Sequence, residues 1–120
     1  MATVTNRRWL AGLAGGVALA ATATVTRSPQ LVGADGIALD VHGAIYVVTA
    51  QNLVLRVGAD GAIETLATAA DGLNQPSTAA FGTARGDQRT LYIANFSLFS
   101  PTPTPGVLTL DVGVPGRPLP

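Results

Sequence analysis

The sequence predicts an all-β protein made of about two four-stranded antiparallel blades of an incomplete β-propeller, preceded by a hydrophobic N-terminal segment. Three observations support this fold class. The chain of 120 residues contains 14 Gly and 8 Pro, so turns are frequent. From Asp35 onward, short apolar runs alternate with turn signals, as expected for strands. The pattern then recurs after about 40 to 46 residues, the spacing typical of propeller blades.

Residues 1–30 are predicted to be a signal peptide or targeting segment. The pair Arg7-Arg8 precedes an uncharged stretch over residues 9–26, and small residues of the A-x-A type follow within it. The pair also resembles a twin-arginine signal, so we expect a periplasmic or secreted protein. A retained membrane anchor is the alternative, although the stretch is short for a span and has few large aliphatic residues. An unstructured start without a targeting role is a third interpretation.

Residues 31–120 are predicted to form the partial propeller. Its first blade is expected from four apolar runs that are separated by tight turns, and an antiparallel meander is the simplest arrangement of such runs. The runs lie at residues 37–39, 45–49, 53–57 and 63–67. His42 and the pair Asp60-Gly61 fall between them and are interpreted as turn residues rather than as parts of a site.

A second blade is expected after a longer connection at residues 71–76. Its runs lie at residues 78–81, 91–95 and 106–110, and no fourth run follows. Residues 101–105 alternate Pro with Thr and are therefore predicted to be a loop. An ordinary small β-sheet is the alternative interpretation of the whole segment.

Composition excludes several classes of function. The chain has no Cys and one His, which rules out disulfides, thiolate metal sites and the HExxH zinc helix. The formal net charge is +0, so no basic face is available for nucleic acid. No serine lies in a G-x-S-x-G context, and a serine hydrolase is therefore not expected.

Two segments resemble a known family. The sequence DGIALDVHGAIYVVTAQNLVLR at residues 35–56 looks like the blade pattern of six-bladed propellers. The segments LYIANF at residues 91–96 and LDVGVPG at residues 110–116 resemble the C-terminus of the regucalcin/gluconolactonase/luciferin-regenerating-enzyme (senescence marker protein-like) family. The resemblance covers about residues 31–120. It implies a six-bladed propeller and a metal-dependent lactonase, which is a hydrolase acting on carboxylic esters of sugars.

The same resemblance implies a divalent metal, calcium or zinc, whose ligands come from separate blades. Asp35, in Ala34-Asp35-Gly36, matches the family's Asp in a P-D-G turn, with Ala in place of Pro. The family's N-terminal Glu and mid-chain Asn have no match here. Because a hard cation needs several oxygen ligands, one carboxylate alone would bind weakly. The alternative role of Asp35 is that of a turn residue that caps its own backbone.

Size argues against a complete propeller. Closure takes typically 4–8 blades, whereas about two are expected here. We therefore expect a fragment that is inactive alone. Its expected partners are complementary propeller blades or further copies of itself. The substrate of the complete assembly would be a small sugar lactone. The alternative function is a secreted non-catalytic β-module that binds a partner through its open blade edges.

Overall fold

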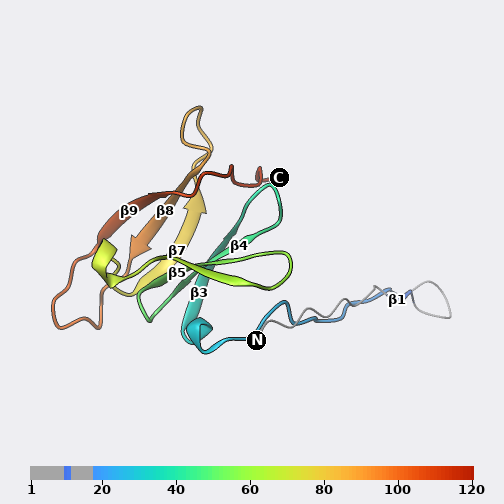
Figure 1. The fold of residues 1–120 in the computed structure, drawn as a ribbon, viewed down its shortest axis with the longest axis horizontal. Coiled ribbons are helices and arrows are strands. Elements are labelled where there is room, and N and C mark those ends of the chain that lie inside the picture. The colour runs from blue at the N-terminus through green and yellow to red at the C-terminus, as the bar shows by residue number, and fades with distance from the viewer. Residues whose placement is uncertain (1–9, 12–17) are drawn as a thin grey trace.

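The structure is a computed structural model that describes residues 10–11 and 18–120 (Figure 1). The pair Arg7-Arg8 and part of the uncharged stretch over residues 9–26 lie outside the described residues, so the predicted targeting signal is left as a prediction. Within the described residues the chain is all-β, as predicted, with two larger antiparallel sheets of four and three strands and a short two-stranded pair. Both sheets are open, and the predicted propeller is not confirmed.

The first sheet is a meander with the strand order β3-β4-β5-β6. Its strands are β3 (Ala34–Leu39), β4 (Ile45–Thr49), β5 (Leu53–Val57) and β6 (Ile63–Ala67). The last three have the predicted bounds. β3 begins three residues before the predicted run, because Gly33 turns the chain with a φ of 75° and a bulge between Ala34 and Ile37 extends the pairing with β4.

The second sheet has the order β7-β8-β9, with β7 (Pro76–Phe81), β8 (Thr90–Asn95) and β9 (Gly106–Asp111). Pro76, which was predicted to lie in the connection, instead opens β7, a position that proline tolerates because no ladder donor is needed there. The Pro-rich segment forms the predicted loop between β8 and β9. No fourth strand follows β9 among the described residues, as the sequence predicted.

The two sheets pack through their first strands, β3 and β7, which lie against each other (Figure 1). Gly36 permits this approach, because a Cβ at that position would lie 2.5 Å from the Cα of Thr78. The core between the sheets includes Tyr46, Leu91 and Ile93, all nearly inaccessible to solvent. Tyr46 also meets Phe81 of the other sheet edge to face, with ring centroids 5.2 Å apart.

Short elements complete the fold. A two-stranded pair, β1 (Leu10–Ala11) and β2 (Ala18–Leu19), precedes the sheets, and a 3-10 turn η1 (Pro29–Leu31) leads into β3. A second 3-10 turn, η2 (Ala69–Asp71), follows β6. It is held by a capping box, in which Thr68 and Asp71 bond each other's backbone N–H groups.

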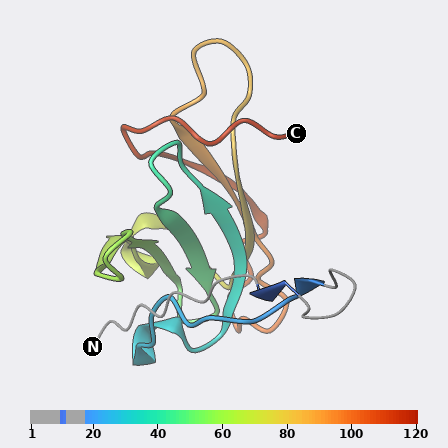
Figure 2. The same cartoon turned by 90° about the vertical axis from the view of Figure 1, so that its right-hand side faces the viewer.

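After β9, the C-terminal segment over residues 112–120 returns to the first sheet (Figure 2). The N–H of Arg117 donates to the carbonyl of Leu39 at 2.9 Å, and the N–H of Val41 donates to the carbonyl of Pro115 at 3.0 Å. The N–H of Gly116 reaches the carbonyl of Gln88 at 2.9 Å. The segment therefore fastens the β3–β4 turn to the β7–β8 loop, and we call it the C-terminal strap.

No helix among the described residues is both long and apolar enough to cross a membrane.

Candidate functional site

Asp35, the predicted metal ligand, is the second residue of β3 and is exposed to solvent. It lies in the bulged part of the strand, between Ala34 and Ile37, and not in a tight turn as the alternative interpretation assumed. The next residue, Gly36, is the point where β3 approaches the backbone of β7 most closely. The fold therefore fixes the Asp35 backbone beside the junction of the two sheets while leaving its carboxylate accessible.

The described residues contain no group of three or more His, Asp or Glu side chains that could together hold a metal ion. Asp35, the one metal ligand predicted from the sequence, therefore lies beside this junction without two further such side chains from the described residues around it. Calcium takes six to eight oxygen ligands and zinc usually four ligands, so Asp35 by itself would fill one position of such a site.

Asn52, Gln75 and Asn95 supply amide groups at the ends of the strands, but their oxygens already accept hydrogen bonds. The Oδ1 of Asn52 accepts the N–H of Gln75 at 2.6 Å. The Oε1 of Gln75 accepts the N–H of Phe99 at 2.9 Å, and the Oδ1 of Asn95 accepts the N–H of Asn74 at 3.0 Å. These hydrogen bonds hold the connection before β7 and the loop after β8 in place. The three amide oxygens are therefore engaged in structure and are not available as ligands.

Backbone strain occurs in the same two connections and in the β4–β5 turn. Asn52, Gln75 and Ser97 are the non-glycine residues with a left-handed backbone in the described part of the chain, with φ values of 62°, 51° and 58°. Such conformations persist only where surrounding contacts enforce them. Here the contacts are visible, because the N–H of Phe96 donates to the carbonyl of Gln75 and Ser97 is buried with its Oγ accepting the N–H of Thr104 at 2.7 Å.

Asp40, directly after β3, is a buried acid that the sequence did not single out as a candidate. It is 0% exposed. Its Oδ1 accepts the N–H groups of His42 at 2.9 Å and Ala44 at 3.0 Å, and its Oδ2 accepts the O–H of Tyr46 at 3.0 Å. A guanidinium nitrogen of Arg56 lies 3.9 Å from Oδ2. Asp40 and Tyr46 lie on either side of the tight β3–β4 turn, six positions apart, and the pairing of the two strands brings them into contact. This spacing is the feature of the sequence that could have indicated the pair.

These contacts decide the protonation of the cluster. Burial acts to raise the pKa of Asp40, but the donated hydrogen bonds and the charge of Arg56 outweigh it and lower the pKa below the ordinary 3.8. Burial, together with the carboxylate that accepts its O–H, raises the pKa of Tyr46 above 10.0. At neutral pH the pair is therefore an ionised acid and a neutral phenol. Because every oxygen of Asp40 is engaged, the cluster anchors the β3–β4 turn and is not poised for acid–base chemistry.

A groove of about 680 Å³ runs between β3, β7 and the C-terminal strap. Its volume falls in the range of small-molecule sites. Most of its lining is apolar, contributed by residues such as Ile37, Phe81 and Leu119, and the polar lining includes Gln88 and Arg117. Asp35 does not line this groove, so the groove and the predicted metal ligand lie at different places along β3.

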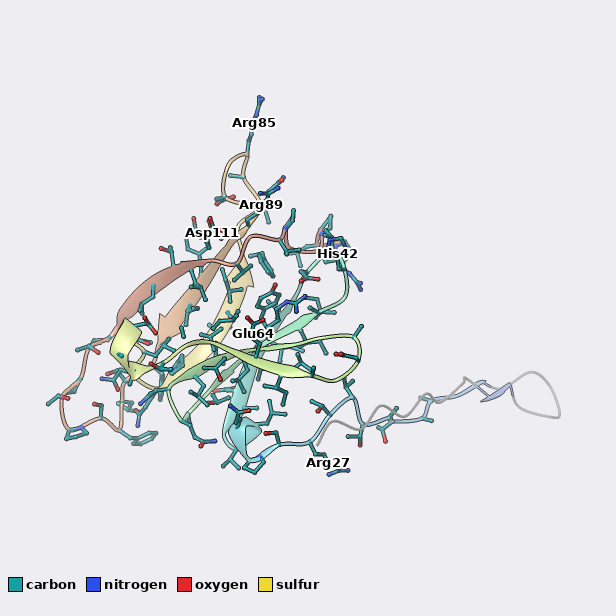
Figure 3. All side chains as sticks on the ribbon, viewed as in Figure 1. Arg27, His42, Glu64, Arg85, Arg89 and Asp111 are labelled. Carbon is teal, nitrogen blue, oxygen red and sulfur yellow. The ribbon has the colours of Figure 1, made fainter. Side chains whose placement is uncertain are left out.

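The charged residues outside the Asp40 cluster are dispersed over different elements (Figure 3). His42 lies on the β3–β4 turn and is exposed, in agreement with its interpretation as a turn residue. Asp60 likewise serves its hairpin, because its Oδ1 accepts the N–H of Ala62 at 3.0 Å. At the end of β8, Asn95 is buried whereas Phe96 is 51% exposed.

Comparison with known proteins gives no assignment: no family model matches the chain, and no curated protein matches it. The resemblance to the regucalcin/gluconolactonase family therefore rests on the short segments named above.

Proposed function

We propose that residues 31–120 supply two blades of a six-bladed propeller of the gluconolactonase type. The assembled propeller would be a metal-dependent hydrolase of small sugar lactones, and this chain would be inactive alone. The observation that carries the proposal is the position of Asp35, an exposed carboxylate beside the junction of the first strands of two stacked antiparallel sheets. The first sheet is a four-stranded meander, and the second sheet has the same strand order over three strands. This repetition supports the assignment of the two sheets as blades.

In this proposal Asp35 is one oxygen ligand of a divalent cation, calcium or zinc, and complementary blades supply the others. When bound, the cation would polarise the lactone carbonyl and lower the pKa of a bound water. The part played by this chain is to present one carboxylate at a fixed position. The close approach of Gly36 to the backbone of Thr78 fixes the strand that carries it.

The proposal is tested by complementation. The full chain is mixed with a polypeptide that carries the remaining four blades of a gluconolactonase-like protein, and hydrolysis of glucono-δ-lactone is followed with calcium, with zinc and with a chelator. We expect no hydrolysis by either part alone and metal-dependent hydrolysis by the mixture. Asp35→Asn should abolish this activity, whereas Asp60→Asn, a matched change in an exposed hairpin, should retain it. Full activity of the Asp35→Asn mixture would refute the ligand role.

We further propose that residues 1–30 direct the protein out of the cytoplasm, to the periplasm or the medium. The support is the sequence pattern around Arg7-Arg8. Expression of the full chain in a bacterium, followed by fractionation and N-terminal sequencing, tests the role. Recovery of a shortened chain outside the cytoplasm is expected, and substitution of both arginines by lysine should keep the chain inside. A full-length chain in the membrane fraction would favour the anchor instead.

A further inference from the structure

Among the residues that the structure describes, no strand pairs with the outer edge of β9. β9 ends the second sheet, whereas the strand at the equivalent place in the first sheet, β5, is covered by β6. The N–H of Val112 donates to the carbonyl of Arg89, which fixes the alternation along β9. In an antiparallel ladder alternate residues face the partner strand. The backbone groups of Leu108 and Leu110 therefore point to β8, and those of Val107, Thr109 and Asp111 point away from it.

This edge has few of the features by which proteins usually protect a free strand, and Asp111 at its end is its single charged residue. Lys, Arg and Pro are absent from Gly106–Asp111, and the pairing of β9 with β8 is continuous over six residue pairs without a bulge. Val107 is 70% exposed on it. β6, the outer strand of the first sheet, is by contrast bordered by the N-terminal segment, since Gln30 donates to Thr65 Oγ1 at 3.2 Å.

The side chains of β9 suit pairing with the same strand of a second copy. In an antiparallel arrangement with its two-fold axis at Thr109, the residues whose backbone groups point outward meet each other. Thr109 then faces Thr109, and Val107 faces Asp111. The same register sets Leu108 opposite Leu110 on the face that packs against the core, where both are half-buried. The two Asp111 carboxylates remain apart, so no like charges oppose each other.

We propose that this protein dimerises through the outer edge of β9, which pairs antiparallel with β9 of a second copy about Thr109 and joins the two three-stranded sheets into one. Such an interface is isologous and closed, because each copy contributes the same strand. The inference concerns self-association alone and does not depend on lactone hydrolysis.

Light scattering during size-exclusion chromatography of the full chain, over a range of concentrations, tests the proposal. We expect a mass twice the chain mass of 12.1 kDa. Thr109→Lys places two like charges opposite each other and should weaken the dimer at least tenfold. An equimolar mixture of Thr109→Lys and Thr109→Glu should restore it, because the charges then attract. Thr83→Lys, the same change in the exposed β7–β8 loop, should leave the dimer intact.

Three results would overturn the proposal: a monomeric wild-type chain at all concentrations, association unaffected by Thr109→Lys, or failure of the mixed variants to recover. Amide hydrogen exchange on the wild-type chain gives a readout that needs no variant to fold. The N–H groups of Val107, Thr109 and Asp111 should exchange more slowly as protein concentration rises. Exchange that is independent of concentration at these three positions would also refute the pairing.

Discussion

Replacement of Asp40 by Ala should destabilise the protein strongly, because the carboxylate is the common acceptor for three donors. Two of these donors are inaccessible to solvent: the N–H of Ala44, whose residue is 2% exposed, and the O–H of Tyr46, whose residue is 0% exposed. A buried donor without a partner costs roughly 1–3 kcal/mol. Two such donors give a loss of about 2–6 kcal/mol, a large part of the roughly 5–15 kcal/mol by which domains are stable.

Urea unfolding followed by far-ultraviolet circular dichroism measures this loss. Asp40→Asn is the matched variant, because its amide oxygen can still accept a backbone N–H and the Tyr46 hydroxyl can rotate to accept from its amide group. We therefore expect Asp40→Asn to lose less than Asp40→Ala. Tyr46→Phe removes one donor together with its need for a partner, so it should cost less than Asp40→Ala as well.

A loss of less than about 1 kcal/mol for Asp40→Ala would refute the reasoning, since it would mean that the donors find other partners. Equal losses for Asp40→Ala and Asp40→Asn would refute it in a different way. That result would show that charge, through Arg56 at 3.9 Å, governs the cluster instead of the short hydrogen bonds.

Three further outcomes are expected. Gly36→Ala should cost about 1–3 kcal/mol of unfolding free energy, because its Cβ would press on the backbone of Thr78; urea unfolding measures it, and an unchanged midpoint would contradict the close approach. Phe81→Leu should lower the free energy of unfolding by about 0.5–1.5 kcal/mol more than its smaller buried apolar area explains, because the edge-to-face pair with Tyr46 is lost. Urea unfolding measures this loss. The same loss in a Tyr46→Phe background would show that the hydroxyl plays no part. Folding lowers the pKa of Asp40, so its contribution to stability is present above its unfolded pKa of about 3.8 and is lost as the pH falls through the lower folded value. In acid unfolding, the free energy of unfolding should therefore fall below pH 3.8, and this fall should be smaller for Asp40→Asn. An identical fall in both proteins would contradict the pKa shift.

Local patterns were sufficient to predict most strands of this fold. The runs at residues 45–49, 53–57 and 63–67 became β4, β5 and β6 without change. Turn chemistry explains this success, because Gly43 and Gly61 adopt the positive φ that their turns require and Asp60 caps its own hairpin. These requirements involve residues within a few positions of each other, which is the range that a sequence pattern can express.

The features that the sequence did not reveal depend on contacts between distant residues. Asp40 falls between two predicted runs, and one of its contacts is local, because its Oδ1 accepts the N–H of His42 two positions later. Its second role, as partner of Tyr46, follows only once the register of β3 and β4 is known. The same holds for the C-terminal strap and the groove beside it, since no local pattern relates Arg117 to Leu39. For Asp35, local sequence indicated a chemistry but not the number of ligands around it.

The C-terminal strap also constrains the order in which the chain can fold. Its bonds join Leu39 and Val41 to residues roughly 75 positions later, and closing so long a loop in an open chain costs about 4 kcal/mol of conformational entropy. Hairpins such as β4–β5 close far shorter loops and form first. Once β3 and β7 are packed, most of the separation has already been bridged, and the strap adds its bonds at little further entropic cost. The strap is therefore a late step in folding, and it closes only around sheets that have already found their correct relative position.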